Sequence, residues 1–125
     1  MVYRVVATQQ GELMPAISFA IPILPGKVEA HVAHGEEVMG SRRAEYAASR
    51  KSLGIRKESA WHQETPNGTL AVVYIEADDP GAAMAGMASS DEPFDVWFRE
   101  SITEIFGIDL SQPMPPPVQV MDASF

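Results

Sequence analysis

The four residues TPNG at positions 65–68 constrain the fold of this chain more than any other stretch of its sequence. Asn-Gly between two runs of β-forming residues is the strongest short-range signal for a β-hairpin. It predicts antiparallel strands over residues 55–65 and 69–78. Because successive side chains of a strand point to opposite faces, the short loop also predicts which residues share a face.

Both faces of the predicted hairpin are substantially apolar. One face carries Ser59, Trp61, Gln63, Leu70, Val72, Tyr74 and Glu76, and the other carries Ala60, His62, Ala71, Val73 and Ile75. One layer of helices covers only one face of a sheet, and an exposed apolar patch of this size is unusual on a soluble monomer. The sequence therefore predicts a homodimer with twofold symmetry, in which a second copy of the chain covers the other face.

The residues around the hairpin predict the order β–α–β–β–α–(α)–β, in which the helix in parentheses is an additional one. A buried strand is expected over 17–24, a long helix over 27–53, and helices over 80–88 and 93–106. The long helix should bury a stripe that contains Val28, Val32, Gly35, Met39, Tyr46 and Leu53, and it should end at Gly54 in the left-handed conformation. The last stretch, VQVMDASF, is a candidate for the final strand.

This order is that of the split βαβ, ferredoxin-like motif, and 125 residues suit one domain. We predict an α+β fold with an extension of uncertain structure at 1–16 and a single ferredoxin-like domain at 17–125. Within the extension, YRVVAT is a candidate for an extra strand. Pro22 conflicts with a central strand because proline cannot donate to the ladder, so a bulge is expected at that strand end.

Four short motifs lie along this framework: Leu24-Pro25-Gly26-Lys27 before the long helix, Arg42-x-x-Glu45 within it, Ile55, Glu58 and Trp61 in the second strand, and Ser90-x-x-Pro93-x-Asp95 before the last helix. Through them, residues 17–110 resemble the dimeric α/β-barrel superfamily and, more closely, its DUF6176-like family, which has no assigned activity. The resemblance implies that two ferredoxin-like subunits press their open sheet faces together into a barrel. It leaves the activity open, since that superfamily includes cofactor-free monooxygenases and haem-binding proteins.

Composition argues against several classes of function. A net charge of −8 repels the phosphate backbone, so we expect no nucleic-acid partner. The absence of cysteine excludes disulfides, thiolate metal sites and a cysteine nucleophile. No apolar run is long enough to span a membrane and no signal peptide is evident, so we expect a cytoplasmic protein without a membrane partner. No phosphate-binding loop, dinucleotide-binding motif or nucleophile elbow occurs, and we expect no cofactor.

The basic residues are concentrated in one segment. Six of the nine cations lie between residues 42 and 57: Arg42, Arg43, Arg50, Lys51, Arg56 and Lys57. The interpretation we favour is a solvated face whose cations complement the C-terminal end of the long helix. The alternative is a functional basic patch.

The histidines and one arginine are the candidates for chemistry. His31 and His34 should diverge around the long helix, with His34 nearer to solvent, so we predict no metal site. Two histidines are candidates for a catalytic acid or base: His62, which lies among alanines on the hairpin, and His31. The alternative is that both are ordinary hydrogen-bonded histidines. Arg42 falls in the buried stripe and should meet Glu76 or Asp95, or border a cavity, unless it extends from the helix edge to solvent.

The residues expected to bind a ligand are Arg42, Trp61, Tyr74 and Trp97, although core or interface packing accounts for the aromatic residues as well. Our leading hypothesis is a protein that binds a small organic molecule between sheet and helices, and it extends to a cofactor-independent, oxygenase-like enzyme. The competing hypothesis is a non-catalytic dimeric protein whose hairpin surface serves only association. The sequence does not identify a substrate.

Overall fold

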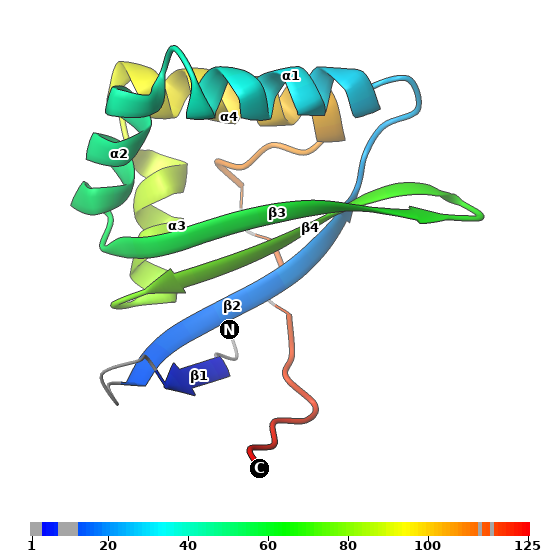
Figure 1. Cartoon of the computed structure of the whole chain (residues 1–125). Coiled ribbons are helices and arrows are strands. Elements are labelled where there is room, and N and C mark those ends of the chain that lie inside the picture. Colours follow the sequence, from blue (N-terminus) through cyan, green and yellow to red (C-terminus); the bar gives the residue numbers. More distant parts are fainter. Residues whose placement is uncertain (1–3, 8–12, 113, 116) are drawn as a thin grey trace.

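The computed structural model of the chain describes residues 4–7, 13–112, 114–115 and 117–125. An antiparallel sheet has the strand order β1-β2-β4-β3, formed by β1 (Arg4–Ala7), β2 (Leu13–Pro22), β3 (Ile55–Thr65) and β4 (Gly68–Ala77). The helices are α1 (Val28–Met39), α2 (Arg43–Ser52), α3 (Pro80–Ser89) and α4 (Pro93–Phe106). They lie on one side of the sheet, with α1 and α4 as the outer layer in Figure 1. The predicted α+β class is confirmed.

The hairpin and its register are confirmed. Strands β3 and β4 pair from Thr65 and Gly68 at the turn, and Trp61 lies opposite Val72. Thr65 stabilises the turn, since its hydroxyl oxygen accepts a hydrogen bond from the Asn67 N–H at 3.1 Å and donates one to the Gly68 carbonyl at 2.7 Å. The two faces therefore carry the side chains that the alternation predicts.

The predicted long helix over 27–53 is wrong, because the chain breaks between α1 and α2. Gly40 follows α1 with ψ −103°, and a Cβ there would lie 2.7 Å from the Glu36 carbonyl oxygen, so the break requires glycine. The predicted buried stripe spans this break, so its residues do not form one continuous buried face. Val32 and Met39 are 47% and 54% exposed. The chain then turns at Gly54, whose φ of 74° is left-handed as predicted.

The expected C-terminal strand is also wrong, since the described residues from 117 to 125 form no strand. In the ferredoxin-like order a last strand would lie beside β2; here β1 occupies that place and pairs Arg4 with Ala16. The candidate strand YRVVAT is thus confirmed at Arg4–Ala7. Strands β2 and β3 flank β4, which makes the arrangement compatible with a ferredoxin-like fold.

Pro22 is accommodated without a bulge. The ladder between β2 and β4 is regular up to Pro22, which pairs with Leu70 as the last residue of β2. The next residue, Ile23, donates its N–H to the Thr69 carbonyl at 2.9 Å. Because successive residues direct their N–H groups to opposite sides of a strand, the nitrogen of Pro22 faces away from β4. On that side β1 reaches only as far as Ala16, so no ladder bond is lost.

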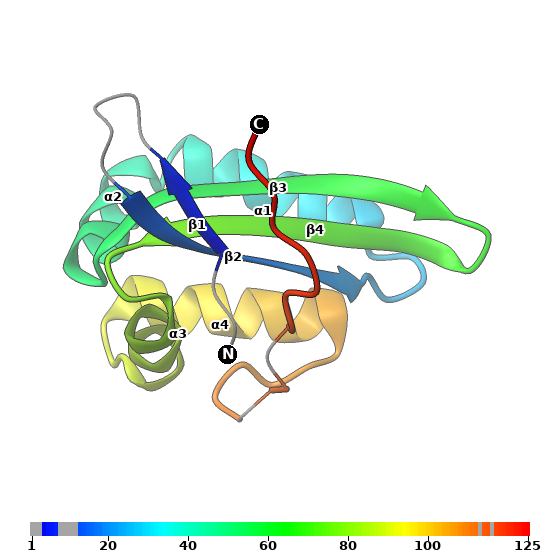
Figure 2. The ribbon, with the colours of Figure 1, turned by 90° about the horizontal axis from the view of Figure 1, so that it is seen from below.

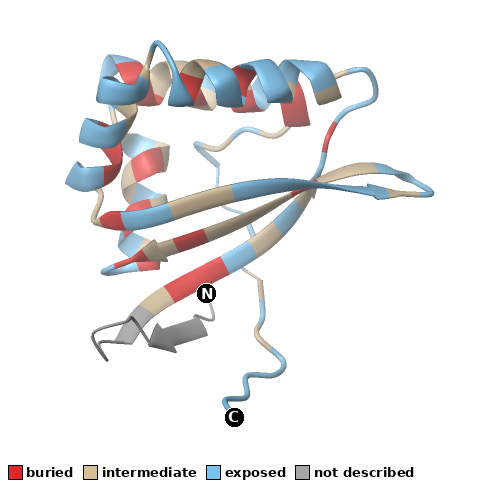
Figure 3. Ribbon diagram, viewed as in Figure 1, coloured by how far each residue is buried: buried red, intermediate tan, exposed pale blue. Residues whose placement is uncertain are grey.

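The core lies between the helix-covered face of the sheet and α3 and α4. Ile17, Ala71 and Ile75 contribute from the sheet, and Phe94, Phe98, Ile102, Ile105 and Phe106 from α4. Figure 3 shows this division, with buried positions on the inner side of α4 and exposed positions along the outer side of α1. Among the described residues, no helix has the length and apolar character needed to cross a membrane.

Candidate functional site

A cavity of about 620 Å³ lies between the sheet and the helices. Its walls are mainly apolar and include Phe19, Ile21, Val73, Ile75, Phe98 and Ile102. Val32, Gly35 and Met39 line it from α1, and all three are exposed, so this side of the cavity opens to solvent. The volume is typical of a site for a small organic ligand.

His31 on α1 and His62 on β3 meet at the lining of this cavity. Nδ1 of His31 lies 2.7 Å from Nε2 of His62, so one ring donates a hydrogen bond to the other. Burial lowers the pKa of His31, and the neighbouring His62 lowers it further. In a neutral pair, one proton lies in the shared bond and the other on the free nitrogen of the accepting ring. The pair therefore offers a ligand one donor and one acceptor.

His34 does not point toward solvent as predicted; it is 7% exposed. Its ring stacks on Trp97 with centroids 5.2 Å apart, and its Nδ1 hydrogen-bonds the Ser101 hydroxyl at 2.7 Å. The His31 and His34 rings lie 6.0 Å apart and nearly parallel. The predicted orientation failed because the helical wheel was centred on a stripe that spans two separate helices. Among the described residues, no group of three or more histidine or acidic side chains could hold a metal ion.

Buried His34 makes stability depend on pH. Burial lowers its pKa to about 4, with a further contribution from His31, whereas an unfolded histidine titrates near 6.5. Between pH 6.5 and 4 the unfolded chain binds a proton that folded His34 does not, so its contribution is present above pH 6.5 and is lost as pH falls to 4. We expect a loss of up to about 3 kcal/mol in the free energy of unfolding.

The matched variant is His34→Gln, which keeps a hydrogen-bonding group near Ser101 but does not titrate. Urea unfolding of both proteins at pH 7 and pH 4.5 should show a smaller loss for the variant. Equal losses would contradict this account of His34.

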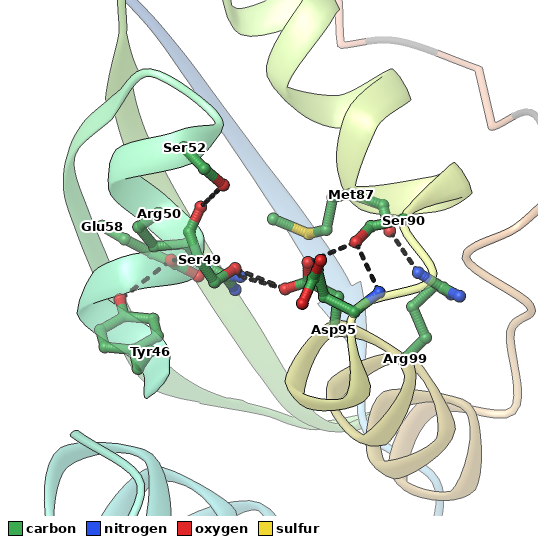
Figure 4. A network of polar contacts seen from close by, with 10 residues as sticks. Tyr46, Ser49, Arg50, Ser52, Glu58, Met87, Ser90, Asp95 and Arg99 are labelled. Atoms are coloured by element: carbon green, nitrogen blue, oxygen red, sulfur yellow. Dashed lines mark hydrogen bonds and ion pairs between the residues drawn. The ribbon is translucent and has the colours of Figure 1, made fainter. Parts of the chain in front are cut away.

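A buried ion-pair network lies beside the cavity (Figure 4). Arg50 is 5% exposed, its Nε donates to Oε1 of Glu58 at 2.7 Å, and its Nη1 lies 3.8 Å from Oδ1 of Asp95. The other oxygen of Asp95 accepts a hydrogen bond from the Ser90 hydroxyl at 2.6 Å. Ser49 donates its hydroxyl to Asp95 as well. The network joins α2, β3 and α4.

Aromatic rings complete the surroundings of the Arg50 guanidinium. Its central carbon lies 4.4 Å from the ring centroid of Phe98 and 5.0 Å from that of Tyr46. Nη2 is buried without a hydrogen-bond partner within the described parts of the chain, and these ring faces supply part of the missing stabilisation. The Tyr46 hydroxyl donates to Glu58 at 2.9 Å. Burial raises the pKa of Tyr46, and the Glu58 carboxylate raises it further.

Arg42 does not make the predicted contacts with Glu76 or Asp95. It caps α2, donates from Nε to Glu37 at 2.6 Å, and lies 3.6 Å from Glu45. The guanidinium lies over the Trp97 ring, 4.0 Å from its centroid. Neither of these two side chains lines the cavity.

Two of the residues expected to bind a ligand, Trp61 and Tyr74, remain to be placed. Trp61 borders the cavity along β3, but its side chain shares the face of Val72, away from the helices, and is 56% exposed. Tyr74 lies on the face away from the helices, where its hydroxyl donates to Glu76 at 2.9 Å. From the predicted set, the cavity lining thus brings together the side chains of His31 and His62. Sequence reasoning missed Arg50, because nothing in the spacing of the helix distinguishes it from the exposed Lys51 beside it.

Comparisons with known proteins found no matching family model, no matching curated protein and no matching solved structure. The resemblance to dimeric α/β barrels therefore stays a prediction.

Proposed function

We propose that the protein binds a small, mainly apolar organic molecule in the cavity between sheet and helices, and that the His31–His62 pair binds its polar group. The observation that carries the proposal is the hydrogen-bonded pair at the lining of an apolar cavity of about 620 Å³. One donor and one acceptor at its polar end suit a hydroxyl, a phenol or an enol. A neutral imidazole can also take a proton from such a group, so the proposal extends to a cofactor-independent enzyme that begins by deprotonating its ligand.

A larger side chain in the cavity should weaken ligand binding without destabilising the fold. Gly35 lines the cavity, and a Cβ added there would meet nothing within 4 Å. Gly35→Leu should therefore place its side chain in the cavity and weaken binding of the neutral probe N-phenyl-1-naphthylamine by at least about tenfold. Because leucine favours helix over glycine by about 0.5–1 kcal/mol, the melting temperature should not fall.

The matched control is Ala33→Leu, an exposed position of α1 that does not line the cavity. It should bind the probe as the unmodified protein does, measured by the rise in probe fluorescence. Absence of probe binding in the unmodified protein, or equal binding by Gly35→Leu, would contradict the proposal.

We also propose that the sheet face opposite the helices closes against a second copy of the chain, as the resemblance to dimeric α/β barrels implies. In Figure 2 the strands lie in front of α1, no helix covers this face, and the C-terminal segment crosses in front of it. Leu70, Val72 and Tyr74 are only partly buried on it, and Trp61 of β3 shares the face by alternation. Burial of this apolar surface in a twofold dimer supplies a driving force for association. A dimer that binds no probe would favour a role in association alone.

A further inference from the structure

A second pocket, of about 610 Å³, lies between α2 and β3 and differs in chemistry from the first. Its charged lining residues are Arg43, Arg50, Lys51, Arg56, Lys57, Glu58 and Asp78. Lys57 lies opposite Glu76 on the sheet face away from the helices, so its side chain points away from the pocket. Four cations against two carboxylates leave a net charge of +2 on the wall, in a chain whose net charge is −8. A local excess of positive charge in an acidic protein attracts anions to this pocket and not to the rest of the surface.

Both carboxylates are already paired. Glu58 accepts from Arg50 at 2.7 Å, and Asp78 accepts from Arg56 at 2.8 Å. The other three cations, Arg43, Lys51 and Lys57, form no ion pair with any residue that the structure describes. Nη1 of Arg43 instead lies 4.0 Å from the sulfur of Met39. Since Lys57 lies on the opposite face, Arg43 and Lys51 are the two cations that share the pocket without counter-charges. A bound anion would relieve the repulsion between them.

The helix dipole accounts for only part of this arrangement. Arg50 and Lys51 lie in the last turn of α2, where cations stabilise the helix. Arg43 is the first residue of α2, where a cation is unfavourable, and Arg56 and Lys57 belong to β3. The fold therefore gathers cations from both ends of a helix and from a strand into one concave surface.

The pocket adjoins the apolar cavity. Met39, Tyr46 and Glu58 line both, so the two spaces share a wall. An anionic group held by the cations would thus lie beside the opening through which an apolar group enters the cavity.

We propose that the basic pocket binds the phosphate group of an alkyl or aryl phosphate whose apolar part occupies the cavity. The placement of the apolar part rests on the proposed function, whereas the anion site rests on the charges of the pocket alone. Phosphate carries up to two negative charges and accepts hydrogen bonds from guanidinium and ammonium groups together, which matches the unpaired Arg43 and Lys51. A free small molecule fits better than a lipid surface, because an anionic membrane repels a chain of net charge −8.

The test compares octyl phosphate, octanol and inorganic phosphate by calorimetry. Octyl phosphate should bind at least about tenfold more tightly than either of the others, and its affinity should fall with added salt. The double variant Arg43→Gln/Lys51→Gln should lose about tenfold in affinity for octyl phosphate and keep its binding of the neutral naphthylamine probe. Lys27→Gln is the matched control, since Lys27 pairs with Glu104 away from both pockets and should leave affinity unchanged.

Each unexpected result would contradict a different part of the proposal. Octyl phosphate binding that is no tighter than octanol binding, or that survives in the double variant, would overturn the anion site. Inorganic phosphate binding that the double variant loses, together with no binding of the naphthylamine probe, would keep the anion site and overturn the proposed function and the amphipathic ligand. Retention of the protein on phosphatidic acid vesicles without binding of octyl phosphate would overturn the choice of a free ligand.

Discussion

Arg50→Met should lower the free energy of unfolding by about 3–5 kcal/mol, because it leaves two buried carboxylates without their cation. The side chains of Glu58 and Asp95 are 16% and 3% exposed, and both lie within 4 Å of the guanidinium. Methionine fills much of the volume of the arginine stem, so the loss is mainly electrostatic. Urea unfolding at neutral pH measures it.

Arg42→Met is the matched control, because the same substitution then removes a cation whose partners are 42% and 51% exposed. Exposed ion pairs contribute about 0–1 kcal/mol, and we expect a loss in that range. Asp95→Asn and Glu58→Gln added to Arg50→Met should restore part of the stability, since they remove the unpaired charges. A loss in Arg50→Met no larger than that in Arg42→Met would contradict the role of this network.

Val72→Lys should convert the proposed dimer into a folded monomer. Val72 lies in the middle of the open sheet face, opposite Trp61 and Ala20. In the dimer an ammonium group there is buried without a partner, which costs several kcal/mol, or about a thousandfold or more in the dissociation constant. In the monomer the position is only partly buried, so the fold should persist.

Light scattering at micromolar concentration measures the result. The unmodified protein should have about twice the chain mass of 13.6 kDa, and Val72→Lys should have the chain mass itself, with an unchanged circular dichroism spectrum. Val32→Lys, the same substitution on the helix side of the molecule, should leave the mass of the dimer unchanged. A monomeric unmodified protein would contradict the assembly.

The failures of sequence reasoning around the predicted long helix come from one local event. Val28, Val32, Met39 and Tyr46 have the spacing of a single amphipathic helix, and that pattern outweighed the low helix propensity of Gly40. The break at Gly40 changes the direction of the chain. It exposes Val32 and Met39, buries His34, and brings Glu37 and Glu45 to Arg42. The buried arginine is consequently Arg50, near the C-terminal end of α2, and not Arg42 at the N-terminal end of the same helix.

The sequence by itself determined the hairpin, its register, the helices over 80–88 and 93–106, and the placement of His62 on the helix-covered face. These features depend on turn chemistry, alternation and capping, which act between residues close in the chain. Only the tertiary structure decided that His31 meets His62, 31 residues away, and that Arg50 meets Asp95. Such contacts depend on how the helices pack against the sheet, and no local sequence pattern encodes that packing.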